Sequence, residues 1–370
     1  MKQGWTYKKL GDVCDIYQPK TLSTKDLIDD GKYPVYGANG VIGRYNSYNH
    51  DSPEVLLTCR GATCGRINIS QPFSWINGNA MVIHRKSDIL SFDFLKYIMS
   101  SLDYSLIITG AAQPQITRQK LAPTVISYPS LSEQKSIVSE LDRINELISL
   151  KKAQLNDLDA LAQSIFYEMF GDPIENNKGW EVKLLGTIAE FKNGLNFSKG
   201  ESRNSYKFLG VSDFQNNKTV LSSSLCDIHL TESISNEYML KTGDIVFVRS
   251  NGSKELVGRN VLMQVDEPTT FSGFCIRCRL TNTAFNSVYL SYLLKAPSMR
   301  PVITNSGRGC NISNLNQKIL SSLPIMRPSM SLQESFATRV SAIEFNRKHL
   351  NDTISALETL LASRLQYWFN

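Results

Sequence analysis

Two stretches of polar and cationic residues follow apolar runs at matching places in the two halves of the chain. The first is Arg60–Arg66, after the apolar run 55–57, and the second is Arg249–Glu255, after the run 244–248. Arginine and asparagine side chains can donate to base edges and phosphates, and glycine lets the backbone approach them closely. The pattern favours nucleic-acid binding by loops at strand ends over ordinary turn chemistry.

Neighbouring loops add further candidates. Gly258-Arg259 aligns with Gly65-Arg66, and the polar segments 110–117 and 307–313 also match, although their Ile-Thr or Ile-Ser core suits a helix cap equally well. The predicted DNA-binding residues are Asn39, Arg44, Tyr45, Arg60, Thr63, Arg66, Gln113, Gln115, Lys199, Arg203, Arg249, Asn251, Ser253, Lys254, Arg259 and Arg308.

Motifs for catalysis do not emerge from the sequence. The four histidines, His50, His84, His229 and His349, stand in no known hydrolase motif, and there is no GxxxxGK[ST] phosphate loop. Gly37–Gly43 has GxxGxxG spacing, which suits a turn better than a dinucleotide fingerprint. We find neither the Asn-Pro-Pro-aromatic motif of adenine methyltransferases nor the spaced acids of a restriction nuclease. The sequence therefore predicts a binding protein without catalytic residues.

Cysteine usage predicts neither disulfides nor a metal site. The seven cysteines are odd in number and scattered, and the one CxxC pair, Cys275 and Cys278, has no second pair to complete a zinc site. Residues 274–280 read as a strand instead. Because the start of the chain lacks a signal peptide and no apolar run reaches about 20 residues, we expect a cytoplasmic protein with no membrane partner.

Positive charge is concentrated in two parts of the chain. Lys and Arg outnumber Asp and Glu by four in residues 1–130 and by six in 173–329, whereas residues 131–172 carry a net charge of −4 and 330–370 are neutral. Two similar cationic parts suggest that both bind a polyanion, although solvated surface lysines would give the same totals.

The chain also repeats itself. Gly4-Trp5 recurs as Gly179-Trp180, and Pro129–Gln134 recurs as Pro328–Gln333. The offset between copies grows from 175 to 199 residues, so the second copy is 24 residues longer, and we place the excess in loops. Strands are expected at 55–57, 81–83 and 244–248, and helices at 92–102 and 289–294.

Each copy ends in a long helix. Residues 131–170 and 331–370 contain no Pro or Gly, Gly171 suits a C-terminal cap, and Ser132 is the expected N-cap of the first helix. Apolar positions recur in steps of three and four, which indicates a coiled-coil seam. The stripes are Ile137, Leu141, Ile144, Ile148, Lys151, Leu155, Leu158, Ala162, Ile165 and Met169, and Phe336, Val340, Ile343, Arg347, Leu350, Ile354, Leu357, Leu361, Arg364 and Trp368.

We predict an α+β protein with two α/β domains in a pseudo-two-fold arrangement, separated by two long helices that form an antiparallel coiled coil. The domains are 1–130 and 173–329, and the helical spacers are 131–172 and 330–370. Each helix could instead fold back on its own domain, or two chains could pair through the helices.

The order and duplication of these segments resemble the specificity subunit of type I restriction–modification systems. The strongest local matches are Val35–Gly40 and Pro129–Ile137, and the resemblance covers essentially the whole chain. Leu332 stands where the first copy has Glu133, so the second helix start departs from the pattern.

The resemblance implies a non-catalytic DNA-binding subunit. Each domain would read one half of an interrupted, asymmetric target in double-stranded DNA, and the helices would space the halves and dock two modification subunits. Those methyltransferase subunits would bind S-adenosylmethionine and methylate adenine. Two restriction/translocase subunits, with ATP and Mg, would join them, and this chain would bind no cofactor. The alternatives are a coiled-coil adaptor between proteins and a free-standing DNA-modifying enzyme with an unrecognised site.

Overall fold

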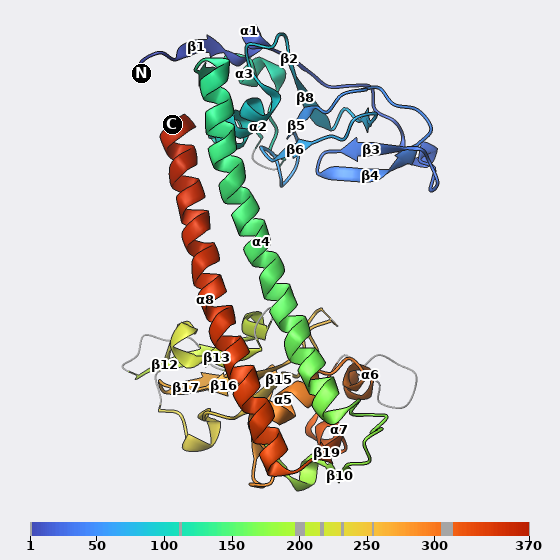
Figure 1. Ribbon diagram of the computed structural model, residues 1–370, viewed down its shortest axis with the longest axis vertical. Coiled ribbons are helices and arrows are strands. Elements are labelled where there is room, and N and C mark those ends of the chain that lie inside the picture. The colour runs from blue at the N-terminus through green and yellow to red at the C-terminus, as the bar shows by residue number, and fades with distance from the viewer. Residues whose placement is uncertain are drawn as a thin grey trace. The chain divides into compact units, whose positions relative to one another are not determined.

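The computed structural model describes residues 2–110, 113–196, 204–214, 218–230, 233–253, 255–304 and 314–369. It divides the chain into a first unit, Met1–Lys152 with Asn351–Asn370, and a second unit, Ala153–Leu350. The boundary between these units falls inside both long helices (Figure 1). Among the described residues, no helix is long and apolar enough to cross a membrane.

The first unit contains two sheets and a two-stranded ribbon. Its four-stranded sheet has the order β2 (Cys14–Tyr17), β8 (Ala80–Arg85), β5 (Val55–Thr58), β6 (Ile67–Ile69). The three-stranded sheet is β4 (Gly40–Tyr45), β3 (Tyr33–Gly37), β7 (Trp75–Ile76), and the ribbon is β1 (Thr6–Lys9) with β9 (Val125–Tyr128). The helical segments are α1 (Leu10–Val13), η1 (Thr24–Asp26), α2 (Phe92–Ser101) and α3 (Arg118–Leu121).

The second unit repeats this plan. Its five-stranded sheet has the order β11 (Ala189–Asn193), β18 (Cys275–Leu280), β15 (Ile245–Val248), β16 (Asn260–Gln264), β13 (Thr219–Leu221). The three-stranded sheet is β14 (Asp227–Leu230), β12 (Asn204–Leu209), β17 (Thr269–Phe271), and the ribbon is β10 (Glu181–Leu184) with β19 (Pro324–Arg327). The helical segments are η2 (Leu185–Thr187), η3 (Val211–Phe214), η4 (Ser222–Ser224), η5 (Asn236–Tyr238), α5 (Ser287–Lys295), α6 (Met299–Thr304) and α7 (Gln317–Ser321).

The sequence repeat is thus a repeat of topology. In each small sheet the central strand has one antiparallel and one parallel neighbour: β3 pairs with β4 and β7, and β12 pairs with β14 and β17. The prediction that the extra length lies in loops is wrong in part. Residues 38–39 alone join β3 to β4, whereas residues 210–226 join β12 to β14 and add η3, η4 and the strand β13.

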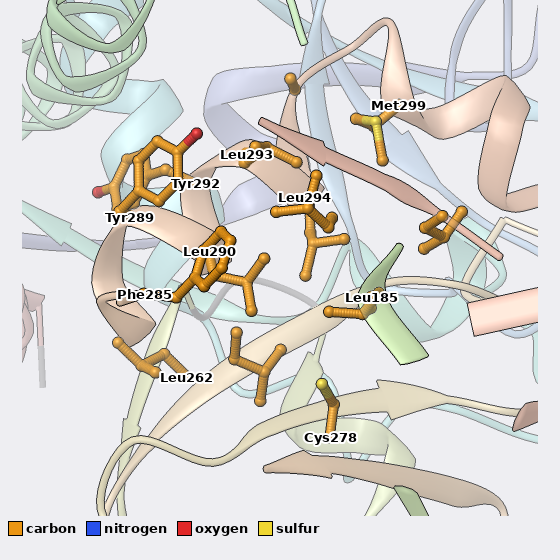
Figure 2. Close-up of a cluster of buried hydrophobic side chains, with 14 of the residues drawn as sticks. Leu185, Leu262, Cys278, Phe285, Tyr289, Leu290, Tyr292, Leu293, Leu294 and Met299 are labelled. Atoms are coloured by element: carbon orange, nitrogen blue, oxygen red, sulfur yellow. The ribbon is translucent and has the colours of Figure 1, made fainter. Parts of the chain in front are cut away.

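Both faces of each main sheet are buried, because successive side chains of a strand point to opposite faces. In β15, Ile245 and Phe247 face the cluster that includes α5, whereas Val246 and Val248 belong to a second cluster. Figure 2 shows part of the first cluster, where Leu262 and Cys278 of the sheet lie on one side and Tyr289 and Leu290 of α5 on the other. Burial on both sides explains why strands such as β15 read as continuous apolar runs.

Cys275 and Cys278 lie in β18, as the strand prediction required, and both thiols are buried. Burial raises the pKa of the Cys275 thiol to about 12. Within the described ranges, no group of three or more His, Cys, Asp or Glu side chains could hold a metal ion.

The long helices are α4 (Leu131–Phe170) and α8 (Met330–Phe369). Within the first unit, Glu140 pairs with Arg364 and Lys152 with Glu358; within the second, Asp159 pairs with Arg347. In the second unit Phe166 also packs against Phe336. In each unit residue numbers rise along one helix as they fall along the other, so the pairing is antiparallel, as predicted. Every residue of both predicted stripes is buried or half-buried.

The helix ends show why the sequence repeats. Gly171 has φ +78° and its N–H donates to Tyr167 O, so the predicted C-terminal cap of α4 is confirmed. The predicted N-cap Ser132 is wrong: α4 begins at Leu131, and Ser130 Oγ accepts from the Glu133 N–H at 3.4 Å. Pro129 ends the preceding strand segment, which leaves Ser130 in the capping position.

The repeated tryptophans receive the far ends of the long helices. In the first unit Trp5 stacks on Trp368, near the end of α8, with ring centroids 6.4 Å apart. In the second unit Trp180 Nε1 donates to Phe170 O, at the end of α4, at 2.9 Å. Each unit is therefore completed by the beginning of one long helix and the end of the other.

A buried glutamine fixes the beginning of each long helix. Gln134 Nε2 donates to Ile89 O and Pro129 O, and its Oε1 accepts from the N–H of Ser91, the N-cap of α2. Gln333 in α8 makes the same three kinds of contact, to Ala284 O, Pro328 O and the N–H of Asn286, the N-cap of α5. Both glutamines have 0% of their surface exposed, so the amide is fully used inside the core.

Candidate nucleic-acid interface

Three loops meet beyond the end of β5 in the first unit: the turn 38–39, the segment 59–66 and the described residues 109–110 and 113–116 of a third loop. The N–H of Gly61 donates to Pro114 O at 2.9 Å, and Arg60 forms an isolated bridge with Gln115. The hydroxyl of Thr63 donates to Asn39 Oδ1 at 2.6 Å. Four predicted residues from three separate loops are thereby brought together.

The turn at Asn39 is firmly held. Ala38 O accepts from the Thr58 hydroxyl and from Asn68 Nδ2, the latter at 3.2 Å. Gly40 has φ +120°, a conformation that only glycine adopts without strain. Asn39 is exposed at the tip of this turn.

Two arginines of this site are free to meet a ligand. Arg60 and Arg66 are exposed, and neither side chain forms a hydrogen bond or ion pair within the described part of the chain. Gln113 and Gln115 are also exposed on the adjoining loop. Such a group of uncompensated cations and amides can donate to phosphates and to acceptors on base edges.

Arg44 and Tyr45 lie on β4 and have other contacts. The Arg44 guanidinium donates to Gly31 O and, at 2.7 Å, to Lys32 O, so it holds the chain that precedes β3. Tyr45 packs edge-on against Trp75, with ring centroids 5.6 Å apart. These contacts support the small sheet, and the structure does not bring either residue to the Asn39–Thr63 contact.

Backbone pairing relates the two strand-end loops residue by residue. The N–H of Gly65 donates to Thr58 O, and the N–H of Gly258 donates to Val248 O, which supports the alignment of Gly65-Arg66 with Gly258-Arg259. At the strand ends, however, the structure does not place Arg249 at the position of Arg60, as matching the two arginines in the sequence would. Cys59 O accepts from Ile116 N, and Arg249 O accepts from Leu315 N.

Arg249 therefore occupies the position of Cys59, and Arg60 corresponds to Ser250. Because strand side chains alternate between faces, Arg60 and Arg249 leave their strands on opposite sides. Elsewhere in this loop, Asn251 Oδ1 accepts from the Ser253 N–H at 2.8 Å, and Arg259 Nε donates to Glu255 O at 3.2 Å. Lys199, Arg203, Lys254 and Arg308 lie outside the described residues.

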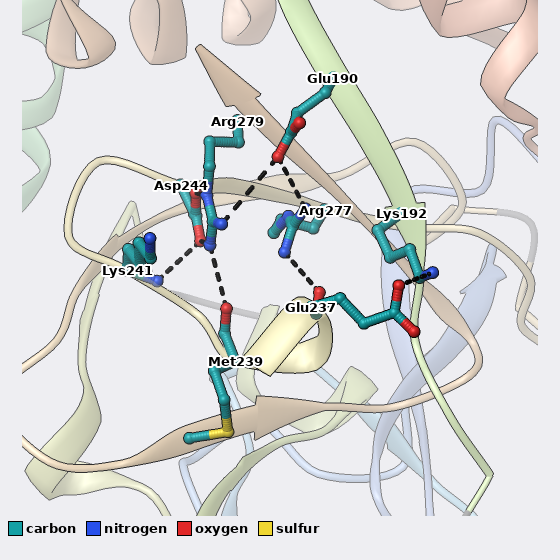
Figure 3. A network of polar contacts seen from close by, with 8 residues as sticks. All are labelled: Glu190, Lys192, Glu237, Met239, Lys241, Asp244, Arg277 and Arg279. Carbon is teal, nitrogen blue, oxygen red and sulfur yellow. Dashed lines mark hydrogen bonds and ion pairs between the residues drawn. The ribbon is translucent and has the colours of Figure 1, made fainter. Parts of the chain in front are cut away.

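Sequence reasoning missed an ionic network at the start of β15, the opposite end of that strand from the Arg249 loop (Figure 3). Asp244, which precedes β15, accepts from Arg279 Nε and Nη2, both at 2.7 Å, and Arg277 donates to Glu190 at 3.0 Å. Hydrogen bonding to Asp244 raises the pKa of Arg279. The signal was available in the period-two spacing of Arg277 and Arg279 within an otherwise apolar strand.

The network holds a loop against the sheet. Arg277 donates to Glu237 O, the Thr270 hydroxyl to Tyr238 O and Arg279 to Met239 O, so three consecutive carbonyls are fixed from the sheet face. The polar groups are therefore structural anchors. The first unit has a different pair at the equivalent place. The strand register puts His84 at the position of Arg279, and His84 Nδ1 lies 2.8 Å from Glu54 Oε1.

Comparison with known proteins agrees with this repeated architecture. The family model "Type I restriction modification DNA specificity domain" matches residues 2–160 and 177–358. The chain is 25% identical over 325 residues to the type I restriction enzyme StySPI specificity subunit of Salmonella potsdam, which covers 82% of this chain and 67% of that protein. It is 23% identical over 396 residues to the EcoKI specificity subunit of Escherichia coli K12, covering 98% and 84%.

The fold is also similar to the crystal structure of a type I restriction–modification S subunit from M. genitalium. The TM-score is 0.59 at 16% identity, and the match covers 100% of this chain and 98% of that chain. The two family-model matches together include most of the sequence and fall one in each copy of the repeat. The chain therefore belongs to the type I restriction–modification DNA specificity family, as a specificity subunit.

Proposed function

We propose that each unit reads one half of an asymmetric target in double-stranded DNA, and that the chain directs adenine methyltransferase subunits to it. One observation carries the proposal: Arg60 and Arg66, beside Asn39 and Gln115, are exposed, and no described residue pairs with their side chains. Phosphate contacts from such arginines supply salt-dependent affinity, and amide contacts to base edges supply specificity. The predicted site residues of the second unit would serve the other half-site.

The partners would dock on the long helices. Leu147 and Leu150 of α4 are exposed in the first unit, and Phe345 of α8, in the second unit, is 74% exposed. Apolar side chains exposed on a helix are typical of a surface that another protein covers. We expect two methyltransferase subunits there, with S-adenosylmethionine, and two restriction/translocase subunits with ATP and Mg in the full complex. None of these cofactors is expected on this chain.

Sequencing of methylated adenines tests the proposal in cells that differ only in this chain. The expected result is one interrupted motif, methylated in cells with the chain and unmethylated in cells without it. Identical methylation in both strains would refute the proposal. Methyl transfer or magnesium-dependent cleavage by the purified chain alone would favour a free-standing enzyme instead.

A further inference from the structure

We propose that Thr63 positions the Asn39 amide so that the first unit requires a guanine at one place in its half-site. This inference rests on the proposed function and names one specificity contact within it. Asn39 is the residue that touches DNA, and Thr63 acts through it as a positioning residue.

The contact between the two side chains fixes the direction of the amide. Thr63 donates to Asn39 Oδ1 at 2.6 Å, and within the described part of the chain Asn39 Nδ2 donates to no protein acceptor. The backbone beneath is rigid, since Thr58 and Asn68 both donate to Ala38 O. The amide thus presents its two N–H donors to solvent from a turn that cannot easily move.

Base chemistry then selects among the four base pairs. An asparagine that reads adenine uses its oxygen and its nitrogen together, accepting from N6 and donating to N7. Because Oδ1 already accepts from Thr63, one of its two lone pairs is used, whereas both Nδ2–H donors remain available to a base. Guanine presents two acceptors, N7 and O6, in the major groove, so it suits a donor pair better than adenine does.

A purely structural role explains this contact poorly. Asn39 is exposed and Thr63 is half-exposed, so their hydrogen bond competes with water and adds little to stability. The turn has its own anchors at Ala38 and a glycine at position 40. The bond is therefore better suited to orienting a side chain than to holding the fold.

The second unit offers a built-in comparison, because its β12–β14 connection spans residues 210–226 in place of a two-residue turn. Among the residues that the structure describes, the Thr63–Asn39 contact has no counterpart in the second unit. Changing Thr63 or Asn39 should alter the base preference at one half-site and leave the preference at the other half-site unchanged.

The test uses the full chain in complex with its methyltransferase subunits. Methylated motifs are compared for wild type, Thr63→Val, Thr63→Ser and Asn39→Ala, and binding is measured on targets carrying guanine or adenine at each position. We expect Thr63→Val and Asn39→Ala to reduce discrimination against adenine by about 5- to 10-fold or more at one guanine of one half-site. Thr63→Ser retains the hydroxyl and should keep the wild-type motif.

Unchanged base preference in Thr63→Val would overturn the inference, as would relaxation at a position that is not guanine. Equal loss in Thr63→Ser and Thr63→Val, or loss at both half-sites, would show a general defect and also overturn it. Failure of the proposed function looks different, because the wild-type chain itself would then direct no methylation to an interrupted motif.

Discussion

In the first unit the acid before β5, Glu54, pairs with a histidine, whereas in the second unit the acid before β15, Asp244, pairs with an arginine. The strands around these pairs have the same order and register. By contrast, the glutamine that fixes the long helix is identical in the two units. Contacts that join a helix to its unit are the same in the two units, whereas the ion pair at the start of the equivalent strand differs.

The difference separates two kinds of constraint. Gln134 and Gln333 each satisfy an N–H and two carbonyls in the core, so another residue would leave buried polar groups unpaired. Loops at strand ends face solvent and are not constrained by the need to pair buried polar groups, so they can change in length and charge. Two units with one frame and different loops are suited to reading two different half-sites.

The largest expected effect comes from shortening both long helices together. Removing residues 148–154 and 351–357 deletes one heptad from each helix and preserves both apolar stripes. About 10 Å of helix is lost, roughly three base pairs of DNA. We expect methylation at the original spacing to disappear; methylome sequencing that still finds the original motif and spacer would contradict a role for the helices in spacing.

Replacing the glutamines should destabilise each unit separately. Gln134→Leu leaves the Ser91 N–H and two carbonyls without partners, and Gln333→Leu does the same around Asn286. Each change should cost about 2–5 kcal/mol of unfolding free energy. Hydrogen exchange should report lost protection mainly in the mutated unit, and exposed Gln119→Leu serves as the control. Equal loss of protection in both units would contradict the inference that each glutamine stabilises its own unit.

Removing single arginines should weaken one half-site at a time. Arg60→Ala should reduce affinity for the target by about 1–3 kcal/mol, and Arg249→Ala should act on the other half. Fluorescence polarisation on targets with one half-site scrambled distinguishes the two effects. Lys8→Ala, which removes an exposed cation from β1, should change binding much less. If all three variants bind alike, the strand-end loops are not the DNA site.

The smallest effect concerns pH. Burial, the largest influence, raises the pKa of Glu54, and the hydrogen bond from His84 opposes it. A carboxyl with a raised pKa holds its proton better in the folded state, so its contribution to stability is present at low pH. That contribution is lost as pH rises from the ordinary glutamate value of about 4.3 through the folded pKa.

Glu54→Gln should remove this part of the pH dependence of first-unit stability. Hydrogen exchange between pH 4 and 7 measures it, with the second unit as an internal reference, because Asp244 there faces a permanently charged arginine. An unchanged pH profile in Glu54→Gln would show that the His84–Glu54 pair does not control it.

Much of the framework was predictable from local patterns. The helix expected at 92–102 is α2, Phe92–Ser101, and the strand expected at 244–248 is β15, Ile245–Val248. Gly171 was recognised as a cap because glycine tolerates positive φ. The site was predicted less completely: Arg60, Thr63, Asn39 and Gln115 do meet, but Arg44 supports the fold instead.

The sequence by itself determined the duplication, the two long helices and their apolar stripes, because periodicity and repeated motifs are properties of the chain. Only the tertiary structure decided that Arg249 lies at the position of Cys59 and not at that of Arg60. It alone also decided that Gln134 and Gln333 fix the beginnings of the two long helices. These facts depend on hydrogen bonds between segments up to 66 residues apart, as from Leu315 N to Arg249 O. Spacing along one strand or helix cannot specify such partners, since they are chosen by packing.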